Sequence, residues 1–115
     1  MNTNTAAKRQ TVEAQLESLS RLTQEELADY DDSTPWDDVV ELAAEELGYT
    51  ATGNGYGGSG SLGYDLEFDG AMEHFGFVYM DAFTGEYHPL TPWLIESAKR
   101  QILEFVADHQ SRNEA

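Results

Sequence analysis

Apolar residues recur every three or four positions in three stretches of the chain, the spacing that places side chains on one face of a helix. The stretches cover about 5–22, 34–47 and 91–109. In the first, the apolar stripe consists of Val12, Leu16, Leu19 and Leu22. The other two stripes consist of Trp36, Val39, Val40, Ala43, Ala44 and Leu47, and of Ile95, Ala98, Ile102, Phe105 and Val106. The pattern therefore predicts three amphipathic helices.

Local signals mark helix ends. Thr34, followed by a proline, combines a preferred capping hydroxyl with the residue best tolerated at the first helical position. Gly48 provides a left-handed stop at the other end of that helix. Thr23 and Glu26 have the spacing of a capping box, which predicts a short additional helix over about 24–30.

Period-two alternation of apolar and polar residues follows in the second half of the chain. It predicts a half-buried strand over 62–68 and a second over 74–80, joined by a turn at Asp69-Gly70. After a turn at 81–85, residues 86–88 can form a short third strand. The elements therefore predict an α+β fold: three N-terminal helices, a three-stranded antiparallel meander, and a C-terminal helix, with the helices packed on one face.

The chain of 115 residues has the size of one domain. We expect flexible tails at 1–4 and 110–115, and a flexible loop at 50–63, which is rich in Gly, Ser, Tyr and Asn. No apolar run is long enough to cross a membrane, and the polar start of the chain does not have the pattern of a signal peptide. Cysteine is absent, which is compatible with a reducing cytoplasm.

Charge changes the picture more than any motif does. The formal net charge is −16, and from Leu22 to Ile95 there is no Lys or Arg. The six basic residues lie near the two ends and are Lys8, Arg9, Arg21, Lys99, Arg100 and Arg112. Because the middle of the chain contains no cation of its own, its sixteen carboxylates should repel one another and attract a partner with a basic surface.

The other motifs that could support chemistry are incomplete. Gly53, Gly55 and Gly58 spell GxGxxG, but they follow a predicted helix in an anionic segment, whereas a dinucleotide site requires them to follow a strand. The acids at 65–69 imitate the start of a calcium loop, yet its twelfth position is Gly76 instead of the required Glu. The three histidines do not have metal-site spacing. We therefore expect no cofactor, no metal site and no enzymatic activity.

The candidate partner-binding residues are carboxylates on two predicted elements, together with two tyrosines. Acids at successive i+4 positions of a helix lie ~5–6 Å apart, and alternate residues of a strand lie ~7 Å apart. Phosphates along a polynucleotide strand have comparable spacing, which is roughly 6–7 Å. The carboxylates are Asp37, Asp38, Glu41, Glu45 and Glu46 on the helix and Asp65, Glu67 and Asp69 on one face of the strand. Tyr56 and Tyr64 are candidate apolar anchors.

In size, charge and its cation-free middle, the chain resembles phage and mobile-element DNA mimics, such as anti-CRISPR and anti-restriction proteins, and acidic immunity proteins against nuclease toxins. The resemblance implies an inhibitor that occludes the basic groove of a nuclease or CRISPR-type surveillance complex. It also implies a location in the cytoplasm of a bacterial host. We expect a basic nucleic-acid-binding partner, no direct binding to nucleic acid or membrane, and a monomer or small homo-oligomer.

A local resemblance concerns residues 78–86, Val-Tyr-Met-Asp-Ala-Phe-Thr-Gly-Glu. This segment is similar to the strand and turn of PepSY domains, small helix-and-sheet modules linked to peptidase inhibition. The same turn also arises in unrelated hairpins, because Asp81 can accept backbone hydrogen bonds and Gly85 can adopt a positive φ. We favour the second interpretation.

Two alternatives remain for the function as a whole. The acidity can reflect solubility or salt adaptation in a non-catalytic interaction or accessory module, which would bind through the glycine-rich loop or an apolar patch. An enzyme with paired carboxylates would require a concave site in which the two pKa values differ strongly.

Overall fold

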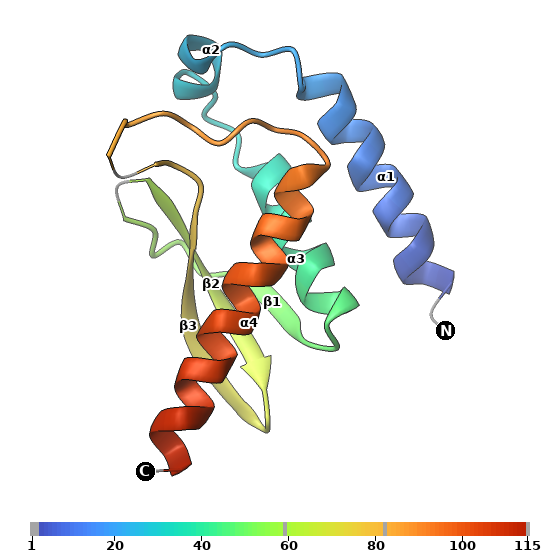
Figure 1. Ribbon diagram of the computed structural model, residues 1–115. Helices are drawn as coiled ribbons and strands as arrows, with labels where there is room; N and C mark the ends of the chain where they lie inside the picture. Colours follow the sequence, from blue (N-terminus) through green and yellow to red (C-terminus); the bar gives the residue numbers. More distant parts are fainter. Residues whose placement is uncertain (1–2, 59, 82, 115) are drawn as a thin grey trace.

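A computed structural model describes residues 3–58, 60–81 and 83–114. It confirms the α+β fold, with three N-terminal helices, an open antiparallel sheet and a C-terminal helix (Figure 1). The helices are α1 (Thr3–Leu19), α2 (Gln24–Ala28), α3 (Thr34–Glu46) and α4 (Trp93–Glu114). The strands are β1 (Thr50–Gly53), β2 (Ser61–Phe68) and β3 (Ala71–Val78).

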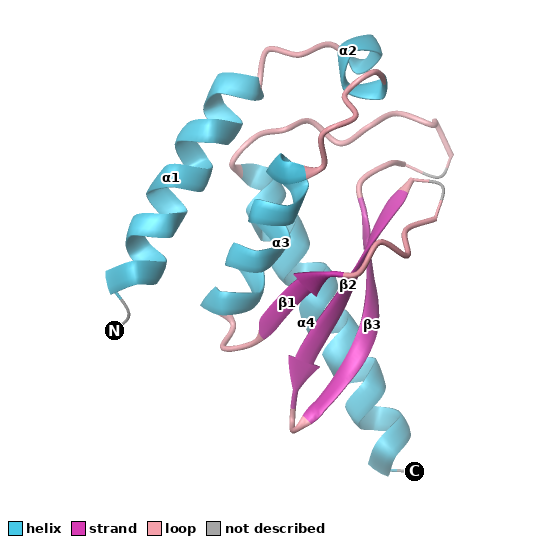
Figure 2. Cartoon of the chain, turned by 180° about the vertical axis from the view of Figure 1, so that it is seen from behind, coloured by secondary structure: helices cyan, strands magenta, loops and turns pink. Residues whose placement is uncertain are grey.

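The sheet has the order β1-β2-β3, and both pairings are antiparallel. In the register, Tyr64 of β2 lies between Gly53 of β1 and Phe75 of β3. Tyr64, Leu66 and Phe68 are buried, whereas Glu67 between them is exposed, so the predicted alternation of β2 is confirmed. The helices lie on one face of the sheet, and the view from behind shows the strands in front of α4 (Figures 1 and 2).

One predicted loop contains a strand, and one predicted strand does not form. The first strand of the meander is β1, which lies inside the stretch predicted as a flexible loop. Residues 86–88 form only an isolated bridge, in which Tyr87 pairs with Met80. The side-chain amide of Gln24 hydrogen-bonds both the N–H and the C=O of Tyr87, and Pro89 has no N–H to extend a ladder. A longer strand therefore does not form there.

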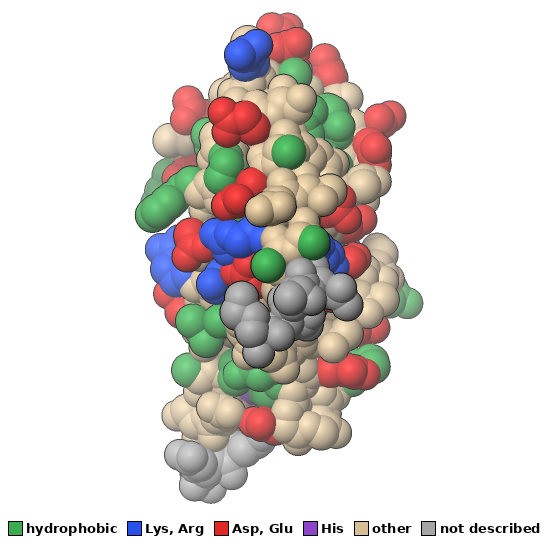
Figure 3. Space-filling model, turned by 90° about the vertical axis from the view of Figure 1, so that its right-hand side faces the viewer, with side chains coloured by type: hydrophobic (Ala, Val, Ile, Leu, Met, Phe, Trp, Pro, Cys, Tyr) green, Lys and Arg blue, Asp and Glu red, His purple; other side chains and the backbone are tan. Residues whose placement is uncertain are grey.

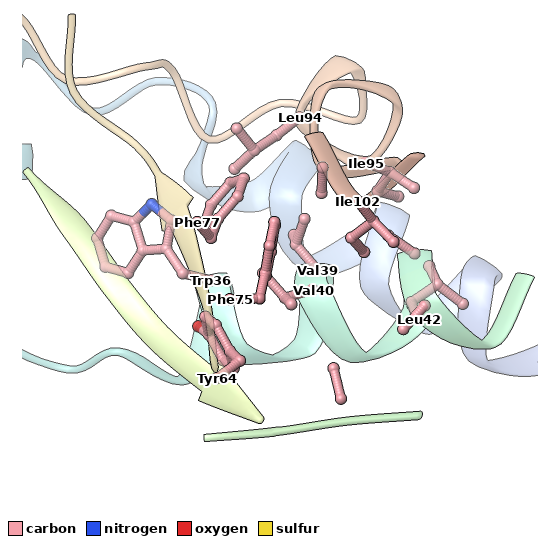
Figure 4. Packing of buried hydrophobic residues seen from close by; sticks show 14 of the residues in the cluster. Trp36, Val39, Val40, Leu42, Tyr64, Phe75, Phe77, Leu94, Ile95 and Ile102 are labelled. Atoms are coloured by element: carbon pink, nitrogen blue, oxygen red, sulfur yellow. The ribbon is translucent and has the colours of Figure 1, made fainter. Parts of the chain in front are cut away.

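Helix α3 is the centre of the core. It packs against α1, α4 and β1, and its buried side includes Trp36, Val39 and Leu42. Figure 4 shows these side chains meeting Phe77 of β3 and Ile102 of α4. Burial of such side chains stabilises the fold by roughly 1.5–3 kcal/mol each. The predicted apolar stripes of the three long helices all contribute to this core.

Several predicted boundaries are confirmed. Thr23 and Glu26 form the capping box, each side chain accepting a hydrogen bond from the backbone of the other residue. Gly48 follows α3 with a φ of +87°. In the 81–85 turn, Asp81 accepts hydrogen bonds from the backbone of Phe83 and Thr84. The predicted cap of α3 was wrong: its N-cap is Ser33, which makes no side-chain capping hydrogen bond, and the Thr34 hydroxyl donates to Asp32 instead.

The predicted tails are shorter than expected. Helix α4 continues through residue 114, and α1 begins at Thr3. Residues 1–2 and 115 of those tails, like Ser59 of the predicted loop and Ala82 of the PepSY-like segment, lie outside the described residues.

The last residue of β3 is bonded on its free edge by a side chain of α4. Gln101 donates a hydrogen bond to the carbonyl of Val78 and accepts one from its N–H. The amide side chain thus makes the pair of bonds that a neighbouring strand would make, which protects this edge from pairing with another chain. Among the described residues, no helix is long and apolar enough to span a membrane.

Candidate functional site

The outward side of α3 carries four carboxylates. Trp36, Val39 and Val40 turn toward the core, so the polar positions between them face away from it. Helical spacing places neighbouring Cβ atoms of these acids ~5–6 Å apart. We call this group the acidic stripe, and its members are Asp37, Asp38, Glu41 and Glu45.

Asp37 links the stripe to the sheet. The hydroxyl of Tyr64 donates a hydrogen bond to Asp37 Oδ1 at 2.6 Å, and the hydroxyl of Ser33 donates one to Oδ2 at 3.0 Å. Burial and then the neighbouring Asp37 raise the pKa of Tyr64, so its hydroxyl stays a donor. Asp37 therefore contributes charge to the stripe while its side chain is held by the fold.

Asp38 and Glu41 are carboxylates whose surroundings oppose their ionisation. Partial burial raises the pKa of both, and nearby carboxylates raise it further. For Asp38 these neighbours are Asp37 and Asp32, and for Glu41 they include Glu45. Lys8 acts in the opposite direction but does not reverse either shift. The surroundings of these two groups therefore disfavour a negative charge, and a cation brought to them would relieve that cost.

The basic ends of the chain partly neutralise the stripe, which corrects the expectation that the middle acids have no internal cation. Lys8 Nζ of α1 lies 3.3 Å from Glu45 Oε1 and 3.8 Å from Glu41 Oε1. Helix α1 packs directly against α3, so residues far apart in sequence meet here. The self-repulsion of α3 is therefore smaller than the sequence suggested.

Glu46 lies outside the stripe in a compact ion cluster. Arg9 of α1 and Lys99 of α4 both contact its Oε1, and Arg9 also reaches Glu96 at 3.0 Å. Burial alone would raise the pKa of Glu46, but the hydrogen bonds and charges of Arg9 and Lys99 outweigh it, and the pKa lies below its usual value. Figure 3 shows basic side chains in a band among acidic ones on this side of the molecule. Glu46 therefore joins three helices and is not free for a partner.

The predicted strand acids do not form one row. Asp65 and Glu67 alternate with buried residues of β2, so they lie on the side of the sheet away from the helices. Asn54 donates a hydrogen bond to Asp65 Oδ1 at 2.9 Å. Asp69 is in the turn after β2, with a φ of 53°, and its carboxylate accepts a hydrogen bond from Gln110 of α4. The prediction that Asp69 shares a face with the other two was wrong.

The helix and strand acids therefore occupy different surfaces. The acidic stripe belongs to the helix layer, whereas Asp65 and Glu67 are on the opposite side of the sheet. The strand period explains this arrangement, because the neighbours of inward-facing residues must face outward.

The two candidate anchors differ in exposure. Tyr56 has 78% of its surface exposed and remains available to a partner. Tyr64 is fully buried in the core, so the prediction that it is an exposed anchor was wrong.

A Cβ on Gly63 would lie 2.5 Å from both Asn54 Oδ1 and the carbonyl oxygen of Tyr56. The glycine-rich segment is thus packed closely on β2 instead of standing free.

Two hollows lie beside the start of α3 and share Ser33 and Leu62 in their walls. One, of about 300 Å³, is lined by Asp37 and by glycines of the 53–57 segment. The other, of about 230 Å³, has aromatic walls, which are formed by Tyr30, Trp36, Tyr79 and Tyr87. These tyrosines come from separate segments and share no periodic spacing, so the sequence contains no signal that groups them.

Among the described residues, no group of three or more His, Asp or Glu side chains is placed to hold a metal ion. Comparison with protein-family models, with curated proteins and with solved structures found no match for this chain. The residues themselves are therefore the basis for a functional assignment, and what they form is an acidic helix face next to an aromatic hollow.

Proposed function

We propose that this protein is a non-catalytic inhibitor whose acidic stripe occupies the basic nucleic-acid-binding groove of a nuclease or CRISPR-type surveillance complex. The observation that supports this proposal most is the state of Asp38 and Glu41. Both are partly buried, and the folded structure raises the pKa of both even though Lys8 is nearby. A basic partner would stabilise charges that the folded protein disfavours, and it would also steer association.

The stripe has the spacing that this role requires. Its carboxylates repeat every three or four residues on one rigid helix, whose opposite side is anchored in the core. Negative charges ~5–6 Å apart can contact a row of Arg and Lys that would otherwise hold phosphates. Tyr56 is an exposed candidate apolar contact, and its neighbours Gly55 and Gly57 share a hollow with Asp37 of the stripe. The proposed interface no longer includes Glu46, Asp69 or Tyr64, whose side chains serve the fold.

The test is competition for DNA. A fluorescent duplex is bound to purified restriction nucleases and to guide-loaded CRISPR complexes, and the protein is titrated in at ~0.1 M and at ~0.5 M salt, where screening is much stronger. We expect displacement of the duplex from one of these complexes, at near-stoichiometric concentrations and weaker at high salt. A protein that displaces DNA from none of them does not have the proposed activity.

A variant pair then tests the surface. Asp38→Asn with Glu41→Gln removes two charges from the stripe, whereas Glu86→Gln with Glu104→Gln removes two charges elsewhere. We expect the first pair to weaken displacement by about tenfold or more and the second to change it little. Equal effects of the two pairs would mean that only net charge matters, and the acidic stripe would not be the binding surface.

The alternative, an accessory module that binds through an uncharged surface, is favoured by a specific observation of its own. Tyr56 is exposed, and its neighbours Gly55 and Gly57 line one of the two hollows beside the start of α3. Binding of this kind would change little between the two salt concentrations. It would be lost on Tyr56→Ala, and it would persist in the Asp38 and Glu41 variant.

A further inference from the structure

The aromatic hollow is built from three segments that only the tertiary structure brings together. They are the stretch from the end of α2 through the first turn of α3, strand β2 at Leu62, and the chain that follows β3. The volume is about 230 Å³, enough for a small organic group. The wall includes Tyr30, Asp31, Trp36, Leu62, Tyr79 and Tyr87.

The four rings form a continuous curved wall. Tyr30 meets Trp36 edge to face with centroids 5.7 Å apart, and Trp36 meets Tyr79 at 5.4 Å with the planes tilted by 50°. Tyr79 and Tyr87 follow at 5.5 Å and 37°. All four residues also line the hollow, so their rings border the space that a ligand would occupy. An arrangement of this kind suits a rounded cation, which is attracted to the faces of aromatic rings.

The electrostatic surroundings favour the same ligand. Asp31 belongs to the wall, and the wall contains no Lys or Arg. The chain has no basic residue between Arg21 and Lys99 except histidine, and its net charge is −16. An anion would therefore be repelled from the hollow, whereas a cation would be attracted.

Trp36 adds an observation that the packing of the core does not explain. Its side chain is only 3% exposed, and its Nε1–H is buried without a hydrogen-bond partner among the described residues. Leaving such a donor unpaired costs about 1–3 kcal/mol. Because this atom is also closed off from the hollow, Trp36 contributes to the wall through its ring and not through its N–H.

We propose that the aromatic hollow is a binding site for a free small molecule with a methylated ammonium group. The rings of Tyr30, Trp36, Tyr79 and Tyr87 contact the methyl groups, and Asp31 balances the charge. This site is separate from the acidic stripe, and it does not depend on the inhibitor function.

Choline is the probe, and its uncharged isostere 3,3-dimethylbutan-1-ol is the control, because the two differ in charge but hardly in shape. The indole N–H signals of a ¹⁵N-labelled sample are followed by NMR during each titration, at ionic strength held constant with NaCl. The two tryptophans are assigned with Trp93→Phe; Trp93 is 76% exposed and lies outside the wall, so it serves as an internal reference. We expect choline to shift the Trp36 signal saturably and to leave that of Trp93 in place.

The same titration on variants locates the ligand. Tyr30→Leu and Tyr87→Leu each remove a half-buried ring, and we expect each to weaken choline binding by about tenfold, whereas Tyr56→Leu, outside the wall, should not. Asp31 is exposed, so Asp31→Asn should leave the fold intact. We expect this variant to bind choline about threefold more weakly. The proposal is overturned by an unsaturable response to choline, by equal binding of the uncharged isostere, or by unchanged affinity in the Tyr30, Tyr87 and Asp31 variants.

Discussion

Neutralising Asp38 and Glu41 should make the protein more stable while it weakens partner binding. Both carboxyls have a raised pKa in the folded protein, first because of burial and then because of neighbouring carboxylates. Folding therefore favours their protonated forms. The stability they contribute is complete below the unfolded pKa values of about 4 and is lost as the pH rises through the folded values. At pH 7 both groups are ionised, and their charges lower the free energy of unfolding.

The size of the effect follows from helical spacing. Three like-charge pairs at i,i+3 or i,i+4 would disappear, namely Asp38 with Glu41 and Glu41 with Asp37 and Glu45. Each such pair costs about 0.2–0.5 kcal/mol. The contact of Lys8 with Glu41, at 3.8 Å and exposed to solvent, would also be lost and offsets about 0.5 kcal/mol. We expect a net gain of about 0.5 kcal/mol in the free energy of unfolding, which corresponds to about 2 °C in Tm.

The assay is urea unfolding of Asp38→Asn with Glu41→Gln at pH 7 and at pH 4, in parallel with the wild type. The matched control is Glu86→Gln with Glu104→Gln, whose carboxylates are exposed. We expect the gain at pH 7 to shrink near pH 4, where the wild-type groups take up protons. A variant that is less stable than the wild type at pH 7, or a gain that is the same at both pH values, would refute the reasoning.

Three further changes test how the fold holds its site. Tyr64→Phe removes the hydrogen bond to Asp37, and chemical unfolding should show a loss of about 1.5–3 kcal/mol. Gly63→Ala places a methyl group against the Asn54 side chain and the backbone of Tyr56, so a loss of about 1–3 kcal/mol is expected, and a neutral result would mean that these two residues are not closely packed on β2. Glu46→Gln should destabilise the protein at pH 7, because Arg9 loses its charged partner. The difference from the wild type should shrink as the pH falls through the lowered pKa of Glu46, because protonation then removes the same charge from the wild type. Thermal melts from pH 7 to pH 3 would show whether the two curves converge.

The helices and the central hairpin could be predicted because their signals are local. The start of α2 depends on contacts between Thr23 and Glu26, three residues apart, and the end of α3 on the left-handed preference of a single glycine. Strands β2 and β3 show their period-two pattern because one side faces the core. Strand β1 has only four residues, of which one is buried, so its pattern is too short to detect.

The amino-acid sequence by itself determined the α+β class, the amphipathic helices and the concentration of carboxylates in the middle of the chain. Only the tertiary structure decided which carboxylates are free. Lys8 and Arg9 reach α3 across 37 residues of sequence, and no local pattern encodes that contact. Packing also buried Tyr64 and gathered Tyr30, Tyr79 and Tyr87 around Trp36. The physical reason is that period and capping act over a few residues, whereas charge compensation and cavity walls depend on which elements the hydrophobic core brings together.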